Sequence, residues 1–158
     1  MSASAGTGIN IINGNSGYCL SVPGASKGTA VGVNQYPCGG FVDQFWTLHY
    51  VPSGPFAGSY TITNDNSGLC LSVPGANFTQ YVQLNQYPCG SPTPFIDQYW
   101  LIIYNFNVGK YEIINVNSSW CASVPGASKA TAAIVNQYPC GDPNPYADQW
   151  WSLGLLTA

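Results

Sequence analysis

The sequence predicts an all-β protein built from three copies of one motif. The six cysteines form two series with a constant spacing of 51 residues: Cys19, Cys70 and Cys121, and Cys38, Cys89 and Cys140. Short runs of β-branched and aromatic residues alternate with Gly, Pro, Asn and Ser, which is typical of short strands joined by turns. Pro or Gly interrupts the chain too often for a helix of useful length.

Each copy contains four predicted strands, which gives about twelve strands in the whole chain. In the first copy the predicted strands span residues 9–13, 18–22, 30–36 and 44–50. The 158 residues are close to the size of one ordinary domain. We therefore expect a single domain over 1-158, divided into lobes of about 7-55, 56-107 and 108-158.

Three short motifs recur in the same order in every lobe. In the first lobe they are a Cys-Leu-Ser-Val-Pro-Gly-Ala segment from Cys19, an Asn-Gln-Tyr-Pro-Cys segment that ends at Cys38, and Asp-Gln-Phe-Trp from Asp43. Side chains alternate between the two faces of a strand. If Cys19 bonds Cys38, Ser21 lies on the same outward face as Asn34 and Tyr36. A polar cluster is therefore expected on each lobe, and the Val-Pro-Gly-Ala segment is interpreted as a turn without a functional role.

The threefold repeat favours one of the fifteen pairings that six cysteines allow. The favoured pairs are Cys19-Cys38, Cys70-Cys89 and Cys121-Cys140. A bridge across such a loop stabilises a protein by roughly 3 kcal/mol on the chain-entropy estimate. Zinc is the alternative, but the cysteine spacing is wrong for it and the single His49 is not repeated. We expect no metal and no cofactor.

Composition excludes several classes of function. The hydrophobic fraction is 46%, with five Trp and eleven Tyr, so the chain has the apolar area that a folded core needs. Charged residues make up only 6%, and the net charge is -3 with no arginine, which argues against a nucleic-acid partner. No apolar run is long enough for membrane insertion. A monomer or weak homodimer is expected.

The cysteine pattern also bears on location. Paired cysteines indicate an oxidising compartment, and Ala3-Ser4-Ala5 is similar to the end of a cleaved signal peptide. The expectation is a mature secreted, extracellular chain to which Met1 was added.

The repeated motifs resemble the ricin B-chain-type (R-type) lectins, a β-trefoil family with a Gln-x-Trp motif in each of three lobes. The motif stands here as Gln44-Phe45-Trp46, Gln98-Tyr99-Trp100 and Gln149-Trp150-Trp151, and the resemblance covers nearly the whole chain. It implies a β-trefoil of twelve strands in three pseudo-threefold repeats. In that family the glutamines and tryptophans are core residues, so Trp46, Trp100 and Trp151 are expected to be buried.

The resemblance also implies a sugar site in every lobe. The family uses an Asp after Cys-Leu, a side-chain amide, a stacking aromatic two residues later, and an Asn before Gln-x-Trp. The matching positions are Ser21, Asn34, Tyr36 and Asp43 in the first lobe, Ser72, Asn85, Tyr87 and Asp97 in the second, and Ser123, Asn136, Tyr138 and Asp148 in the third. Phe41, Phe95 and Tyr146 precede the Asp by two residues and are candidates for a second wall.

The chain departs from the family in the same way in all lobes: it has Ser then Asp where the family has Asp then Asn. An ionised acceptor forms a stronger hydrogen bond with a sugar hydroxyl than a neutral one. The hypothesis is that Asp43, Asp97 and Asp148 supply this acceptor and that the serines are weaker partners. The alternative is that each Asp caps a turn, or bonds a backbone N–H in the loop before its strand. For the tyrosines the alternative is a half-buried residue at the end of a strand.

The resemblance implies a non-catalytic carbohydrate-binding lectin with up to three sites, and galactose-type glycans are the first expectation. Catalysis is not expected, because the repeated acids occur once per lobe beside neutral partners and no cysteine is left as a nucleophile. Two alternatives remain open. One is a β-trefoil protease or glycosidase inhibitor that acts through a single loop, and the other is the accessory binding module of a polysaccharide-degrading enzyme.

Overall fold

A computed structural model describes residues 8–154, in which the strands are all short. They are β1 (Asn10–Asn13), β2 (Cys19–Ser21), β3 (Val31–Gly32), β4 (Asn34–Tyr36), β5 (Trp46–Tyr50), β6 (Tyr60–Asn64), β7 (Cys70–Ser72), β8 (Asn85–Tyr87), β9 (Trp100–Asn105), β10 (Lys110–Asn115), β11 (Cys121–Ser123), β12 (Asn136–Tyr138) and β13 (Trp151–Gly154). The helical segments are three-residue 3₁₀ turns: η2 (Pro23–Ala25), η3 (Val42–Gln44), η4 (Pro74–Ala76), η5 (Ile96–Gln98), η6 (Pro125–Ala127) and η7 (Ala147–Gln149).

The predicted all-β fold with four strands per lobe is confirmed, with one addition. The run predicted as a single strand over 30–36 is divided at Val33 into β3 and β4, so the described residues contain 13 strands. The division arises because β3 pairs with β8 of the second lobe, whereas β4 pairs with β2 of its own lobe. Ala3-Ser4-Ala5, the segment similar to a signal-peptide end, lies outside the described residues.

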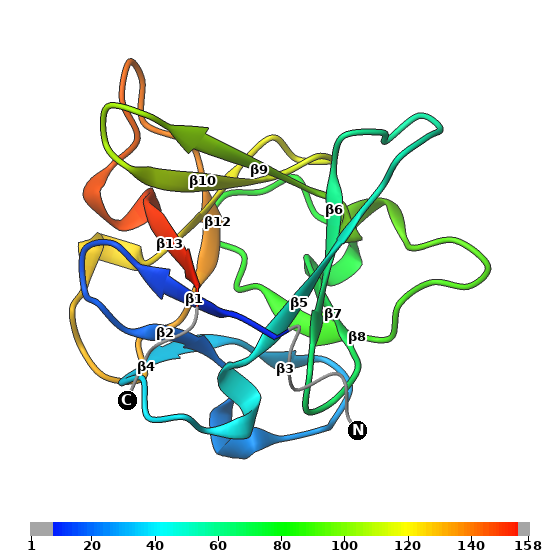
Figure 1. Cartoon of the computed structure of the whole chain (residues 1–158), viewed down its shortest axis with the longest axis horizontal. Coiled ribbons are helices and arrows are strands. Elements are labelled where there is room, and N and C mark those ends of the chain that lie inside the picture. Colours follow the sequence, from blue (N-terminus) through cyan, green and yellow to red (C-terminus); the bar gives the residue numbers. More distant parts are fainter. Residues whose placement is uncertain (1–7, 155–158) are drawn as a thin grey trace.

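Six strands form a closed barrel (Figure 1). β1 pairs with β13, β13 with β10, β10 with β9, β9 with β6 and β6 with β5, all antiparallel. The ring closes where Ile9 and Trp46 exchange two backbone hydrogen bonds of 2.8 Å. Closure leaves these strands without an unpaired edge. No helix in residues 8–154 is long and apolar enough to cross a membrane.

Three hairpins pack across one end of the barrel, and each is formed by the second and third strands of a lobe. The pairs β2–β4, β7–β8 and β11–β12 share one register, in which Cys19 lies opposite Tyr36 and Ser21 opposite Asn34. The three predicted disulfides are confirmed: Cys19–Cys38, Cys70–Cys89 and Cys121–Cys140, with Cα–Cα distances of 5.1 to 5.2 Å. The predicted shared face of Ser21, Asn34 and Tyr36 is thus present.

The core repeats with the lobes, because equivalent positions supply equivalent apolar side chains. Its members are Ile11, Ile62 and Ile113; Leu20, Leu71 and Ala122; Val22, Val73 and Val124; Val33, Leu84 and Val135; and Trp46, Trp100 and Trp151. The three tryptophans are fully buried, as predicted. Each indole N–H donates to a backbone carbonyl, such as Trp46 Nε1 to Leu20 O at 3.0 Å, which removes the cost of burying it.

A ring of buried glutamines joins the lobes. Gln35 Nε2 donates to Ser128 O and Ala130 O of the third lobe, both at 3.0 Å. The equivalent bonds run from Gln86 to Ser26 O and Gly28 O, and from Gln137 to Asn77 O and Thr79 O. Each lobe therefore fixes the loop that follows the Val-Pro-Gly-Ala turn of the preceding lobe.

Candidate functional site

Each lobe contains one pocket, between its hairpin, its Val-Pro-Gly-Ala turn and the loop before Gln-x-Trp. The pocket volumes are about 440, 480 and 580 Å³ in lobes one, two and three. We call them site 1, at Ser21, Asn34, Tyr36 and Asp43; site 2, at Ser72, Asn85, Tyr87 and Asp97; and site 3, at Ser123, Asn136, Tyr138 and Asp148. All of these residues line their pockets except Asn136.

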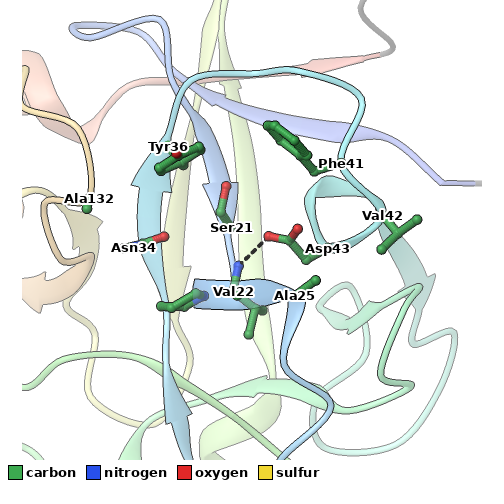
Figure 2. Close-up of a pocket in the computed structure, with 11 residues that line it drawn as sticks. Ser21, Val22, Ala25, Asn34, Tyr36, Phe41, Val42, Asp43 and Ala132 are labelled. Carbon is green, nitrogen blue, oxygen red and sulfur yellow. Dashed lines mark hydrogen bonds between the residues drawn. The ribbon is translucent and has the colours of Figure 1, made fainter.

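Two aromatic rings stand over the mouth of each pocket. In site 1, Tyr36 at the end of β4 and Phe41 just before η3 are exposed at 41% and 50%, and their ring centroids are 6.0 Å apart (Figure 2). Tyr87 and Phe95 have a separation of 6.2 Å in site 2. Tyr138 and Tyr146 are 6.1 Å apart in site 3. The structure therefore brings the second-wall candidates close to the tyrosines predicted to stack on a sugar.

The aspartates lie at the bottom of the pockets and are held by the opposite turn. Asp43 Oδ2 accepts a 2.8 Å hydrogen bond from the backbone N–H of Val22 (Figure 2). Asp97 makes the same bond with Val73 and Asp148 with Val124, at 2.9 and 2.8 Å. One oxygen of each Asp thus accepts from a backbone N–H, but the donor lies in the opposite turn and not in the loop of the Asp itself; Figure 2 shows the other oxygen of Asp43 directed away from Val22.

Burial changes the titration of two of these carboxyl groups. Asp97 and Asp148 are 8% and 7% exposed. Burial raises the pKa of each above the ordinary value, and the hydrogen bonds from Val73 and Val124 oppose this effect only in part. Both carboxylates are therefore desolvated acceptors, and a hydrogen bond to a desolvated acceptor is stronger than one to an acceptor in water.

The serines are already engaged by the protein. Ser21 Oγ donates to Cys19 O at 2.9 Å and accepts from Gln44 Nε2 at 3.0 Å, and its exposed fraction is 2%. Ser72 and Ser123 repeat both bonds. A hydroxyl has one donor and two acceptor positions, so each serine keeps one acceptor position at most. The carboxylates therefore have more capacity for a ligand than the serines.

The amides that lie opposite the serines in the hairpins are different, because their oxygens have no partner. Oδ1 of Asn34, Asn85 and Asn136 are the buried side-chain polar atoms without a hydrogen bond among the described residues. These residues are exposed at only 8%, 6% and 1%. Leaving a buried acceptor unsatisfied costs about 1–3 kcal/mol. In Figure 2 the oxygen of Asn34 points toward Ser21 and Asp43, where a ligand hydroxyl can satisfy it.

The glutamine of each Gln-x-Trp motif connects the walls of its pocket. Gln98, which is fully buried, donates to Ser72 Oγ and Pro88 O, both at 3.0 Å. Its Oε1 accepts from Gly90 N at 3.1 Å and from Phe95 N at 3.0 Å. This one side chain therefore fixes both the serine on the hairpin and the aromatic of the second wall.

Sequence reasoning missed two parts of the pockets. The Val-Pro-Gly-Ala turn, interpreted as having no functional role, forms a wall of every site, and its Gly24 adopts a φ of 64° that favours glycine. In addition, each pocket takes one residue from another lobe: Ala132 in site 1, Ala30 in site 2 and Tyr81 in site 3. The threefold recurrence of Val-Pro-Gly-Ala directly after the site serine was an available signal for the turn.

One group of potential metal ligands occurs among the described residues, and it is not a metal site. Glu112, Cys121 and Cys140 lie close together, but both sulfurs are joined in a disulfide and have no thiolate to offer.

Comparison with known proteins identifies the family. The ricin-type beta-trefoil lectin domain matches residues 58–154, and the related ricin-type beta-trefoil lectin domain-like family matches residues 2–87. The chain belongs to the ricin-type beta-trefoil lectin domains. No curated protein matches this ricin-type domain.

Solved structures show the same fold. The designed threefold symmetric protein ThreeFoil is 26% identical, with a TM-score of 0.83 over 94% of this chain and 99% of its own. An exo-beta-1,3-galactanase from Clostridium thermocellum is also 26% identical, with a TM-score of 0.83 over 95% of this domain, which corresponds to only 30% of the galactanase. The Macrolepiota procera ricin B-like lectin, solved with lactose, is 16% identical, with a TM-score of 0.75 over 99% of this domain and 100% of its own chain.

Proposed function

We propose that this ricin-type domain binds carbohydrate without catalysis at sites 1, 2 and 3, and that its ligands are galactose-type glycans. The observation that carries the proposal is the unpartnered Oδ1 of Asn34, Asn85 and Asn136 in the same position of every lobe. A repeated, buried acceptor beside a fixed carboxylate suits a ligand that offers several hydroxyl groups. No such orphan is expected where the polar groups serve only the fold.

The walls of the pockets suit a sugar ring. One face of a sugar presents C–H groups, which pack well on an aromatic ring, and the hydroxyl groups at its edge need hydrogen-bond partners. Tyr36 and Phe41 supply the apolar surface of site 1. Asp43 and Asn34 supply hydrogen-bond acceptors, and each hydrogen bond to them contributes about 1 kcal/mol or more to the binding free energy. This division between walls and floor is typical of small-molecule sites.

Galactose-type ligands are supported by relatives of the same fold. The Macrolepiota procera lectin was solved with lactose, and the galactanase that contains a similar domain acts on beta-1,3-galactan. The galactanase also supports the alternative of an accessory binding module, because its similar domain makes up about 30% of that larger enzyme. Binding at sites 1 to 3 is proposed in either setting. Three disulfides and the lectin fold fit an extracellular protein.

Repetition of the site has a physical use. A single shallow site with a millimolar Kd contributes about -4 kcal/mol. Sites held on one rigid body gain roughly 10² to 10⁴ in avidity when a ligand engages more than one of them. The proposal is therefore a multivalent lectin that cross-links glycans or cells.

A glycan array followed by calorimetry tests this function. We expect binding to galactose-terminated glycans, a stoichiometry of up to three sugars per chain, and cross-linking of a galactose-bearing polymer that free galactose inhibits. A protein that binds no glycan at any density contradicts the proposal and favours the inhibitor alternative, which an enzyme-inhibition assay against proteases and glycosidases then examines.

Acid should weaken binding at sites 2 and 3 while the fold persists. Since burial raises the pKa of Asp97 and Asp148, these groups become protonated at a higher pH than ordinary aspartates and stop being ionised acceptors. Acid has the opposite effect on the contribution of these two carboxyl groups to the stability of the folded protein. A carboxyl whose folded pKa exceeds its unfolded pKa stabilises the folded state below the unfolded pKa, and this contribution is lost as pH rises through the folded pKa.

Calorimetric titrations with galactose at pH 7 and at the lowest pH at which circular dichroism shows the folded spectrum measure this effect. We expect a lower affinity at the acidic pH with an unchanged spectrum. Equal affinity at the two pH values in a folded protein contradicts the role of the two carboxylates.

A further inference from the structure

Site 3 differs from the other two at a position contributed by another lobe. Ala30, Tyr81 and Ala132 occupy equivalent places in the repeat and share a positive φ of 67°, 72° and 68°. Figure 2 shows Ala132 beside Asn34 and Tyr36 at the edge of site 1. The same backbone geometry therefore presents a methyl group to sites 1 and 2 and a phenol ring to site 3.

The position of Tyr81 is fixed by the backbone of the third lobe. Its N–H donates to Gln137 O at 2.8 Å, as Ala30 donates to Gln86 O and Ala132 to Gln35 O. Gln137 is adjacent to Tyr138, and the two rings are in contact with centroids 4.9 Å apart at an angle of 49°. Their hydroxyl groups are 3.4 Å apart. Tyr81 thus continues the aromatic surface of Tyr138.

Site 3 is larger than the other two sites, and Tyr81 lines it without filling it. The pocket of site 3 is about 580 Å³, compared with about 440 and 480 Å³ for sites 1 and 2. Tyr81 keeps 58% of its surface exposed. Site 3 also has a tyrosine, Tyr146, where the other two sites have phenylalanine, so its rim carries three phenol hydroxyl groups in place of one.

We propose that site 3 binds a glycan one sugar unit longer than the glycans of sites 1 and 2, with the added unit packed against Tyr81. This inference rests on the proposed function. Two neighbouring rings at an angle match two linked sugars, whose mean planes are also inclined to each other. The phenol hydroxyl groups supply hydrogen-bond partners for the second sugar, which sites 1 and 2 do not offer at this edge.

Titrations with galactose and with lactose test the inference, because lactose adds one sugar unit. Two-dimensional NMR of the isotopically labelled full chain separates the sites, since Ala132, Ala30 and Tyr81 line one site each. In the unsubstituted protein we expect lactose to be favoured over galactose more at site 3 than at sites 1 and 2. Tyr81→Ala should lower the lactose affinity of site 3 about two- to tenfold, the range for one aromatic contact, and change its galactose affinity less than about twofold.

Ala30→Tyr is the reciprocal variant and should raise the lactose affinity of site 2 without affecting site 1. Tyr81 shows that tyrosine is accommodated at this backbone conformation. Phe78→Ala is a matched control, because Phe78 is an exposed aromatic in the same loop that lines none of the three pockets. The Phe78→Ala variant should bind galactose and lactose with the same affinities as the unsubstituted protein.

The failure of this inference can be distinguished from the failure of the proposed function. If Tyr81→Ala leaves both affinities unchanged, or weakens galactose and lactose equally, the extended site is rejected while sugar binding stands. If neither sugar nor any other glycan binds the unsubstituted protein, the proposed function is rejected and this inference with it.

Discussion

Replacing Asp43, Asp97 and Asp148 together with asparagine is expected to weaken sugar binding by about 10- to 100-fold at each site, in a protein that stays folded. Asparagine keeps the size of the side chain, and its Oδ1 can accept the bond from the backbone N–H of Val22 that holds Asp43. What disappears is the ionised acceptor for a sugar hydroxyl, and hydrogen bonds to charged groups are worth about 1.5–3 kcal/mol.

Thermal unfolding by circular dichroism and calorimetry with galactose measure the two halves of this prediction. The melting temperature should be unchanged or higher, because burial of the Asp97 and Asp148 carboxylates is unfavourable in the native protein. Asp65→Asn is the control: Asp65 is exposed, bonds Thr47, and lines none of the three sites. If the triple variant is folded and binds sugar as tightly as the unsubstituted protein, the prediction is contradicted and the aspartates serve only the fold.

Removing all three disulfides is expected to unfold the protein at 25 °C. Each bridge joins cysteines separated by 19 residues, for which the chain-entropy estimate is about 3 kcal/mol. The stability of a whole domain is about 5–15 kcal/mol, so three bridges are comparable with the entire free energy of unfolding. The effect should exceed that of any single substitution at the sites.

Urea unfolding of variants with one, two and three cysteine pairs replaced by alanine tests this expectation. The single-pair variants Cys19→Ala/Cys38→Ala, Cys70→Ala/Cys89→Ala and Cys121→Ala/Cys140→Ala serve as mutual controls. They should lose similar amounts of stability because their loops are equally long. A triple-pair variant with the urea midpoint of the parent protein contradicts the prediction.

The repeat made much of this fold predictable from sequence. The constant cysteine spacing favoured the pairing of Cys19 with Cys38 and of its equivalents in the other lobes, and the structure contains these bridges. Period-two alternation then placed Ser21 and Asn34 on the same face. The burial of the tryptophans followed from the family resemblance, and large aromatic side chains in a repeated strand commonly form the core.

Other features of the sites depend on contacts that no spacing within a lobe specifies. Tyr81 reaches site 3 only because its backbone bonds Gln137 of the next lobe. The engagement of Ser21 depends on where the buried Gln44 side chain points. The orphan oxygen of Asn34 is visible only when every neighbouring donor has been placed. These are tertiary properties, so a residue-by-residue match to the family could name the positions but not their hydrogen-bond state.

The hydrogen bonds of the glutamine ring make the contact between neighbouring lobes a head-to-tail interface, in which different surfaces of the two lobes meet. The first lobe has both the donor and the acceptor surface of this interface. Gln35 donates to the third lobe, and Ser26 O and Gly28 O accept from the second lobe. Interfaces of this heterologous type close into rings when the rotation between units is a whole fraction of a turn, as it is here. The peptide links between lobes therefore supply proximity, while the information for threefold closure is present in one repeat. One repeat made as a separate chain of about fifty residues is therefore expected to associate as a cyclic trimer.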